Sequence, residues 1–94
     1  MRQVLITGAS SDIGIELCRH YSDKAYRVIA HYNNGQDAFL RLLDENKNIA
    51  PLQIDFSKSE NVERGIAKNR ELITASDVLI NAAAILEPQP FADL

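Results

Sequence analysis

The chain has 94 residues, 46% of them hydrophobic, and a formal net charge of -3. This length is enough for one domain, although folding buries only about 60 to 65% of the surface of the unfolded chain. The negative charge and the scattered Lys and Arg residues argue against a nucleic-acid partner. No apolar run is long enough for a membrane span and residues 1–25 lack a signal-peptide pattern, so we expect a cytoplasmic protein.

The first elements in the chain predict a buried strand followed by an amphipathic helix. Residues 3–7 are apolar and β-branched and end at a glycine, as in a parallel strand. Residues 12–23 carry an apolar stripe with helical spacing. Cys18 lies on this stripe and is the only cysteine, which excludes an intrachain disulfide or a multi-cysteine metal site. We expect Cys18 to be a core residue rather than a nucleophile.

The rest of the chain alternates between strand and helix. A strand over 26–32 ends in the turn residues 33–35, and a helix over 36–46 precedes a strand over 49–54. Ser57 and Glu60 match a capping box, which predicts a helix that continues to about residue 74. Residues 77–85 form the expected fourth strand. Pro51 requires the third strand to lie at an edge of the sheet, since proline cannot donate to a ladder.

This alternation predicts an α/β fold of the Rossmann type, built as a single domain over residues 1–94. Three layers are expected, with helices on both faces of a parallel sheet of about four strands in the order 3-2-1-4. Strands one and four then flank the point where the chain reverses direction across the sheet. Ligands of open α/β sheets bind there, at the carboxyl ends of the strands.

The loop after the first strand has the spacing of a phosphate-binding loop. Gly8 allows a tight exit from the strand, and Gly14 allows close packing of the helix on the sheet. The free N–H groups of the first helical turn then face an anion. The segment resembles the Thr-Gly-x-x-x-Gly-x-Gly loop of the short-chain dehydrogenases/reductases through six residues: Thr7, Gly8, Ser10, Ser11, Ile13 and Gly14.

Other segments extend this resemblance over all 94 residues. Asp55 resembles the family's aspartate that accepts from the adenine amino group, and Phe56 beside it is included in the expected cofactor site. Asn81, Ala82 and Ala83 are similar to the Asn-Asn-Ala-Gly element that lines the nicotinamide ribose. The resemblance implies an NAD(P)-dependent oxidoreductase whose C-terminal half is absent from this chain.

Three residues depart from the family pattern. Asp12 stands at the middle glycine, Ala82 at the second asparagine and Ala84 at the closing glycine. A carboxylate about 4 Å from a phosphate would oppose binding by roughly 4 kcal/mol at an effective dielectric constant of about 20. Aspartate is also a favoured N-cap. We therefore expect Asp12 to cap the helix by accepting from the N–H groups of residues 14 and 15, which leaves the loop usable and Asp12 within the cofactor site.

The end of the second strand indicates the cofactor. NAD-specific proteins place an acid there to hold the ribose hydroxyls, whereas this chain has no acid before Asp37. We expect NADP, with NAD less favoured. Ser10, His31 and Asn33 are the candidates near the 2′-phosphate, and the alternative for His31 is a solvated surface position.

Catalytic residues of the family are not recognised in the chain. Family members use a Tyr as general acid and base, a Lys four residues later, and a Ser that polarises the carbonyl. The three tyrosines here are followed four positions later by Ala25, Ala30 and Gln36. We therefore expect the dinucleotide-binding part of an NADP(H)-dependent carbonyl reductase or alcohol dehydrogenase, inactive as this chain. The alternative is a stand-alone nucleotide-binding or assembly module.

The fourth strand suggests self-association. Without a fifth strand it presents unpaired N–H and C=O groups beside an apolar face, and no Lys, Pro or bulge protects it. We expect a homo-oligomer, a two-fold dimer formed through this strand or its neighbouring face. The alternative is that residues 85–94 fold back over the edge.

Overall fold

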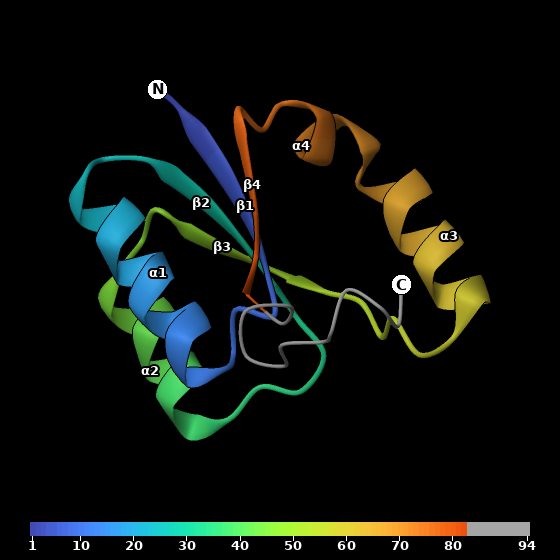
Figure 1. Cartoon of the computed structure of the whole chain (residues 1–94), viewed down its shortest axis with the longest axis horizontal. Helices are drawn as coiled ribbons and strands as arrows, with labels where there is room; N and C mark the ends of the chain where they lie inside the picture. The colour runs from blue at the N-terminus through green and yellow to red at the C-terminus, as the bar shows by residue number, and fades with distance from the viewer. Residues whose placement is uncertain (83–94) are drawn as a thin grey trace, which may run out of the picture.

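The computed structural model describes residues 1–82 and contains a single parallel sheet (Figure 1). Its strands are β1 (Gln3–Thr7), β2 (Arg27–Tyr32), β3 (Ile49–Gln53) and β4 (Val78–Asn81). They lie in the order β3-β2-β1-β4, which confirms the predicted topology, and β3 with Pro51 forms one edge. Figure 1 shows α1 and α2 on one side of the sheet and α3 and α4 on the other.

The helical layer formed by α1 (Asp12–Asp23) and α2 (Asp37–Glu45) covers the larger part of the core. Alternate residues of the strands face this layer, so that Val4 and Ile6 point into it while Leu5 points to the opposite face. Cys18 is fully buried here, and this burial raises the pKa of its thiol to about 12. This burial confirms the prediction of a core cysteine, and a thiol with so high a pKa stays protonated at neutral pH.

The opposite layer consists of α3 (Ser59–Lys68) and α4 (Arg70–Thr74), and it is thinner. Its core contains Leu5, Ile29, Leu52 and Ile54, and neither helix has a fully buried residue. α3 approaches the sheet closely at Gly65, where an added Cβ would lie 2.7 Å from Cδ1 of Ile54. The second layer therefore leaves more of the sheet accessible than the first.

The predicted single helix from the capping box to residue 74 is wrong in two respects. The Ser57 hydroxyl donates to Asp55 at 2.6 Å instead of capping a helix, and Lys58 precedes α3 without a side-chain cap. α3 ends at Asn69, whose backbone leaves the helical conformation with φ -113° and ψ 20°. The Asn69 backbone N–H still makes the helical bond to the carbonyl of Gly65, and its side-chain amide donates to the same carbonyl at 2.8 Å. Side-chain hydrogen bonds to nearby groups therefore accompany both departures from the predicted helix.

A buried glutamine ties β1 to the segment before β4. The side chain of Gln3 donates to the carbonyl of Leu72 at 2.7 Å and to the Ser76 hydroxyl at 2.9 Å. Its backbone N–H donates to Asp77 at 2.9 Å. These bonds place the entry to β4 beside β1, which brings the ends of both strands to the same side of the molecule.

Within residues 1–82, β4 has β1 as its one partner strand. Leu79 is 68% exposed, because its register partner Leu5 faces the thinner helical layer, which does not reach this edge. No helix in this range is long and apolar enough to cross a membrane. The described part of the chain also contains no group of three or more His, Cys, Asp or Glu residues arranged to hold a metal ion.

Candidate nucleotide-binding site

The loop between β1 and α1 makes a tight turn at Gly8. This glycine has a φ of 67°, a left-handed conformation that glycine adopts without steric cost. The Gly8 carbonyl accepts from the backbone N–H of Ser11 at 3.3 Å and from its hydroxyl at 2.7 Å. The chain therefore reverses from the end of the strand directly into the helix.

Ser11, and not Asp12, is the N-cap of α1. Ser11 has an extended backbone, and its hydroxyl oxygen accepts from the N–H of Gly14 at 3.1 Å. Asp12 is the first helical residue, and its side chain is exposed. The expected capping role of Asp12 is thus wrong, because the serine one position earlier already satisfies the N–H group. A carboxylate in the first turn still interacts favourably with the positive end of the helix dipole.

Gly14 lies directly against the backbone of the loop. A Cβ added to it would lie 2.7 Å from the Cα of Ala9 and would also meet the carbonyl oxygen of Gly8. Only glycine allows α1 to begin this close to the end of β1. The first turn of the helix is thereby directed at the carboxyl edge of the sheet, with Ser10 half-buried in the loop and Ile13 packed against the core.

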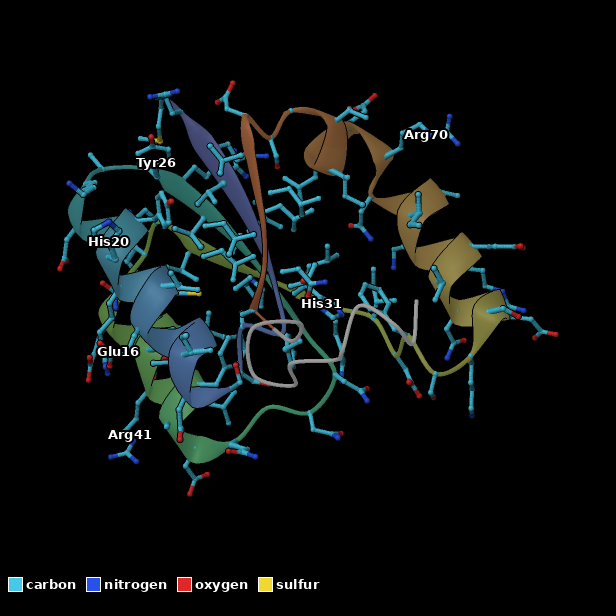
Figure 2. All side chains as sticks on the ribbon, viewed as in Figure 1. Glu16, His20, Tyr26, His31, Arg41 and Arg70 are labelled. Atoms are coloured by element: carbon cyan, nitrogen blue, oxygen red, sulfur yellow. The ribbon has the colours of Figure 1, made fainter. Side chains whose placement is uncertain are left out.

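His31 lies in the interior and not on the surface (Figure 2). Only 6% of the residue is exposed, so the alternative of a solvated histidine is wrong. Its ring contacts the phosphate loop through Gly8 and the end of β3 through Ile54. The sequence prediction placed His31 near the 2′-phosphate of NADP and did not foresee that both ring nitrogens contact the backbone of neighbouring segments.

Asp55 and Phe56 follow β3 at the same edge of the sheet. The hydroxyl and backbone N–H of Ser57 both donate to Oδ1 of Asp55, at 2.6 and 2.9 Å. These two bonds, the hydroxyl first, lower the pKa of Asp55, so the side chain is an ionised acceptor at neutral pH. Phe56 is half exposed and its ring stacks on that of His31, with centroids 4.0 Å apart and planes 10° from parallel.

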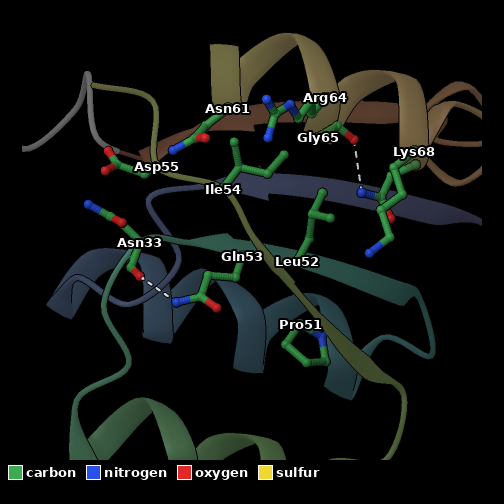
Figure 3. Close-up of a pocket in the computed structure, with 11 residues that line it drawn as sticks. Asn33, Pro51, Leu52, Gln53, Ile54, Asp55, Asn61, Arg64, Gly65 and Lys68 are labelled. Atoms are coloured by element: carbon green, nitrogen blue, oxygen red, sulfur yellow. Dashed lines mark hydrogen bonds between the residues drawn. The ribbon is translucent and has the colours of Figure 1, made fainter. Parts of the chain in front are cut away.

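A groove of about 600 Å³ runs from Asp55 between β3 and α3 (Figure 3). Asn33 stands at the same end of the groove, where its carbonyl accepts from the side chain of Gln53 at 3.0 Å. Asn61 and Arg64 line the groove from α3, and sequence reasoning missed both residues. Their spacing of three positions puts both side chains on one face of α3, which was the available sequence signal. Whether that face turns toward the groove depends on how α3 packs against the sheet.

The end of β4 joins this edge through Thr7 and Asn81. The Thr7 hydroxyl donates to Oδ1 of Asn81 at 2.9 Å, and the two residues are register partners in the sheet. Ala82 is fully buried in the core beneath α1. Ala83 lies outside the described residues. The structure therefore brings the loop, the end of β3 and the end of β4 to one edge of the sheet.

This arrangement defines a Rossmann-type nucleotide-binding domain, with a glycine loop opening a helix at the point where the strand order reverses. The sequence profile of the short chain dehydrogenase family matches residues 2–94, and the chain belongs to this family. An uncharacterized oxidoreductase of Schizosaccharomyces pombe is 36% identical over 97 residues, which is 99% of this chain and 34% of that protein.

Two solved structures show the same fold with different cofactors. A short chain dehydrogenase from Leptospira borgpetersenii with bound NAD+ has a TM-score of 0.65 and 25% identity, over 85% of this chain and 30% of that one. ElxO with NADP bound has a TM-score of 0.66 and 26% identity, over 85% and 34%. The chain thus spans about a third of the length of these relatives, and the likeness leaves the choice between NAD and NADP open.

Proposed function

We propose that this chain binds NADP(H) at the carboxyl edge of its sheet, as the cofactor half of a reductase of the carbonyl reductase or alcohol dehydrogenase type. The observation that carries the proposal is the contact of Gly14 with the loop backbone, because it points the first turn of α1 at this edge. The pyrophosphate would accept from the backbone N–H groups of Ser10, Asp12 and Ile13, since that of Ser11 donates to the Gly8 carbonyl. The comparisons do not favour a stand-alone module.

Adenine would bind beside Asp55. Oδ1 is occupied by Ser57, while Oδ2 makes no hydrogen bond within residues 1–82, so Oδ2 is the atom that would accept from the adenine amino group. Phe56 offers one face of its ring, since the other is stacked on His31. Ser10 and Asn33 are the proposed neighbours of the 2′-phosphate, and Asn81, Ala82 and Ala83 would lie toward the nicotinamide ribose.

Calorimetric titration with NADPH, NADH and ADP-ribose tests the binding. We expect micromolar to millimolar affinity for NADPH, since one half of the family's site lies outside these residues. Absence of heat and of a thermal shift at millimolar ligand would reject the binding proposal.

The same preparation should not oxidise NADPH with a panel of ketones and aldehydes, because no Tyr-x-x-x-Lys pair is in the chain. Turnover that is abolished by a mutation within the chain would reject the proposed inactivity.

The preference for NADP(H) is tested by Asn33→Asp. Asn33 is exposed and directly follows β2, so the isosteric change adds a carboxylate where NAD-specific proteins hold the ribose hydroxyls. We expect the ratio of NADPH to NADH affinity to fall roughly tenfold, by repulsion of the 2′-phosphate and by hydrogen bonding to the hydroxyls. Asn34→Asp is the matched control with the same charge one residue further on. Equal ratios for both variants would place the 2′-phosphate elsewhere.

We propose in addition that the protein forms a two-fold dimer through β4 or the adjacent face. The exposed Leu79 and the single partner strand of β4 within residues 1–82 support this. Light scattering at about 100 µM should report a dimer, and Leu79→Lys should shift it to monomer. Leu40→Lys, a half-exposed leucine on α2, is the control and should leave the dimer intact. A monomeric wild-type protein would contradict the proposal.

A further inference from the structure

His31 joins three separate segments at the carboxyl edge of the sheet. Its ring atom Nδ1 accepts from the backbone N–H of Gly8 at 3.2 Å, and its own carbonyl accepts from the N–H of Ala9 at 2.8 Å. On the other side of the ring, Nε2 is 2.9 Å from the carbonyl of Ile54. The first two residues of the phosphate loop are therefore held by this one residue on β2.

These partners determine the protonation state of the ring. A backbone N–H always donates, so Nδ1 facing Gly8 must carry a lone pair. A carbonyl always accepts, so Nε2 facing Ile54 must carry the proton. Both requirements are met by the neutral imidazole with its proton on Nε2. A second proton, on Nδ1, would set two N–H groups against each other in a site that is almost closed to solvent.

We propose that His31 is a positioning residue for the phosphate loop: its neutral ring holds Gly8 in place, and protonation of Nδ1 releases the loop and weakens dinucleotide binding. The proposal deepens the proposed function and rests on it for the binding step, while the link between His31 and Gly8 stands on the geometry alone.

The surroundings of the ring support a neutral histidine. Burial lowers its pKa below the ordinary value of 6.5, and the hydrogen bond to Ile54 opposes this in part. The ring contacts Gly8, Ile54 and Phe56, none of which titrates. Among the charged residues that flank these contact segments in the chain are Asp12 on α1 and Asp55 and Lys58 after β3. None of these side chains is hydrogen bonded to the ring, and the shift of the His31 pKa has no contribution from a neighbouring charge.

The lowered pKa of His31 determines whether folding stability rises or falls with pH. The folded protein resists the proton that the unfolded chain accepts near pH 6.5, so the stabilising contribution of the neutral ring is complete above that pH. It is lost as the pH falls from 6.5 through the lowered pKa of the folded state. Loop order and dinucleotide affinity should decline over the same interval.

The first experiment needs no nucleotide. NMR of the 15N-labelled protein, titrated from about pH 8 to about pH 4.5, follows the His31 ring nitrogens and the Gly8 amide together. We expect the Nε2-protonated tautomer at neutral pH, and a Gly8 amide shift that changes with the same midpoint as the ring. An Nδ1-protonated tautomer, or a Gly8 amide that does not follow the ring, would overturn the proposal.

The second experiment compares two variants for NADP+ affinity. In His31→Asn the side-chain oxygen replaces Nδ1 as an acceptor that does not titrate, whereas His31→Leu has no acceptor. Between about pH 7.5 and about pH 5, the NADP+ affinity of the wild-type protein should fall roughly tenfold more than that of His31→Asn. His31→Leu should bind NADP+ weakly at both pH values. Comparison at the same pH cancels titration of the ligand. An equal fall for wild type and His31→Asn would overturn the proposal.

The two experiments separate the two claims. If the Gly8 amide follows the ring but NADP+ does not bind, the proposed function fails and the role of His31 in the loop stands. If NADP+ binds but the Gly8 amide does not follow the ring, the proposed function stands and the role of His31 in the loop fails. A His31→Leu chain that does not fold leaves the NMR result and the His31→Asn comparison to decide.

Discussion

Gly14→Ala should cost about 3 kcal/mol of unfolding free energy and abolish measurable dinucleotide binding. The new methyl group would lie 2.7 Å from the Cα of Ala9 and 2.8 Å from its carbonyl carbon. These are backbone atoms that no rotamer change can move, so α1 must shift away from the loop. Urea unfolding and calorimetric titration measure the two effects, and the melting temperature should fall by roughly 10 °C or more.

Two other glycines provide matched controls for the same substitution. At Gly65 the added methyl would lie 2.7 Å from the end of the Ile54 side chain, which can change rotamer, so Gly65→Ala should cost about 1 kcal/mol. At Gly35 the nearest atom is a side-chain carbon of Leu40 at 3.4 Å, so Gly35→Ala should change stability by less than about 0.5 kcal/mol. If Gly14→Ala were no more costly than Gly35→Ala, the close contact between α1 and the loop would be refuted.

Ser11→Ala should reduce stability by about 1 to 2 kcal/mol and weaken NADPH binding by roughly tenfold. The hydroxyl donates to the Gly8 carbonyl at 2.7 Å and accepts from the Gly14 N–H at 3.1 Å, so its loss removes the cap and loosens the turn together. Thermal or urea unfolding gives the first value and calorimetric titration the second.

Asp12→Asn is the informative comparison for Ser11→Ala. Asp12 is exposed and does not cap the helix, so removal of its charge should cost less than about 0.5 kcal/mol. It should also tighten NADPH binding by roughly fivefold, because a carboxylate beside the pyrophosphate is repelled. Because asparagine also caps helices, Asp12→Ala tests the cap itself: a large loss of stability with Asp12→Ala and none with Ser11→Ala would restore Asp12 as the cap.

The sheet could be predicted from the sequence because its signals are local. Apolar β-branched runs at residues 3–7 and 49–54 indicate strands, and Pro51 excludes a central position for the second of them. The order β3-β2-β1-β4 is that of the doubly wound fold, which places the third strand at an edge as Pro51 requires. The start of the helix after β3 could not be predicted equally well. The Ser57 hydroxyl can either cap a helix or bond to Asp55 two residues earlier in the turn, and the structure shows the bond to Asp55.

Some residues of the candidate site could likewise be found from the sequence, and others could not. Gly8 and Gly14 could be found from the sequence, since glycine at a tight turn and at a close helix contact has a local physical reason, and Asp55 was indicated by the resemblance to the family. Asn61 and Arg64 could not, because their place at the groove depends on the packing of α3 against β3. The choice of Ser11 over Asp12 as the cap was also undetermined, because both residue types cap helices and they are neighbours in the chain.

By itself, the sequence determined the class of fold, the strand order and the position of the phosphate loop, because hydrophobic period, proline and glycine restrict the backbone locally. Only the tertiary structure decided the role of His31. Its ring lies 3.2 Å from the N–H of Gly8, 23 positions earlier, and 2.9 Å from the carbonyl of Ile54, 23 positions later. No periodicity records such contacts, because they exist only once β1, β2 and β3 lie side by side and bury the ring between their ends.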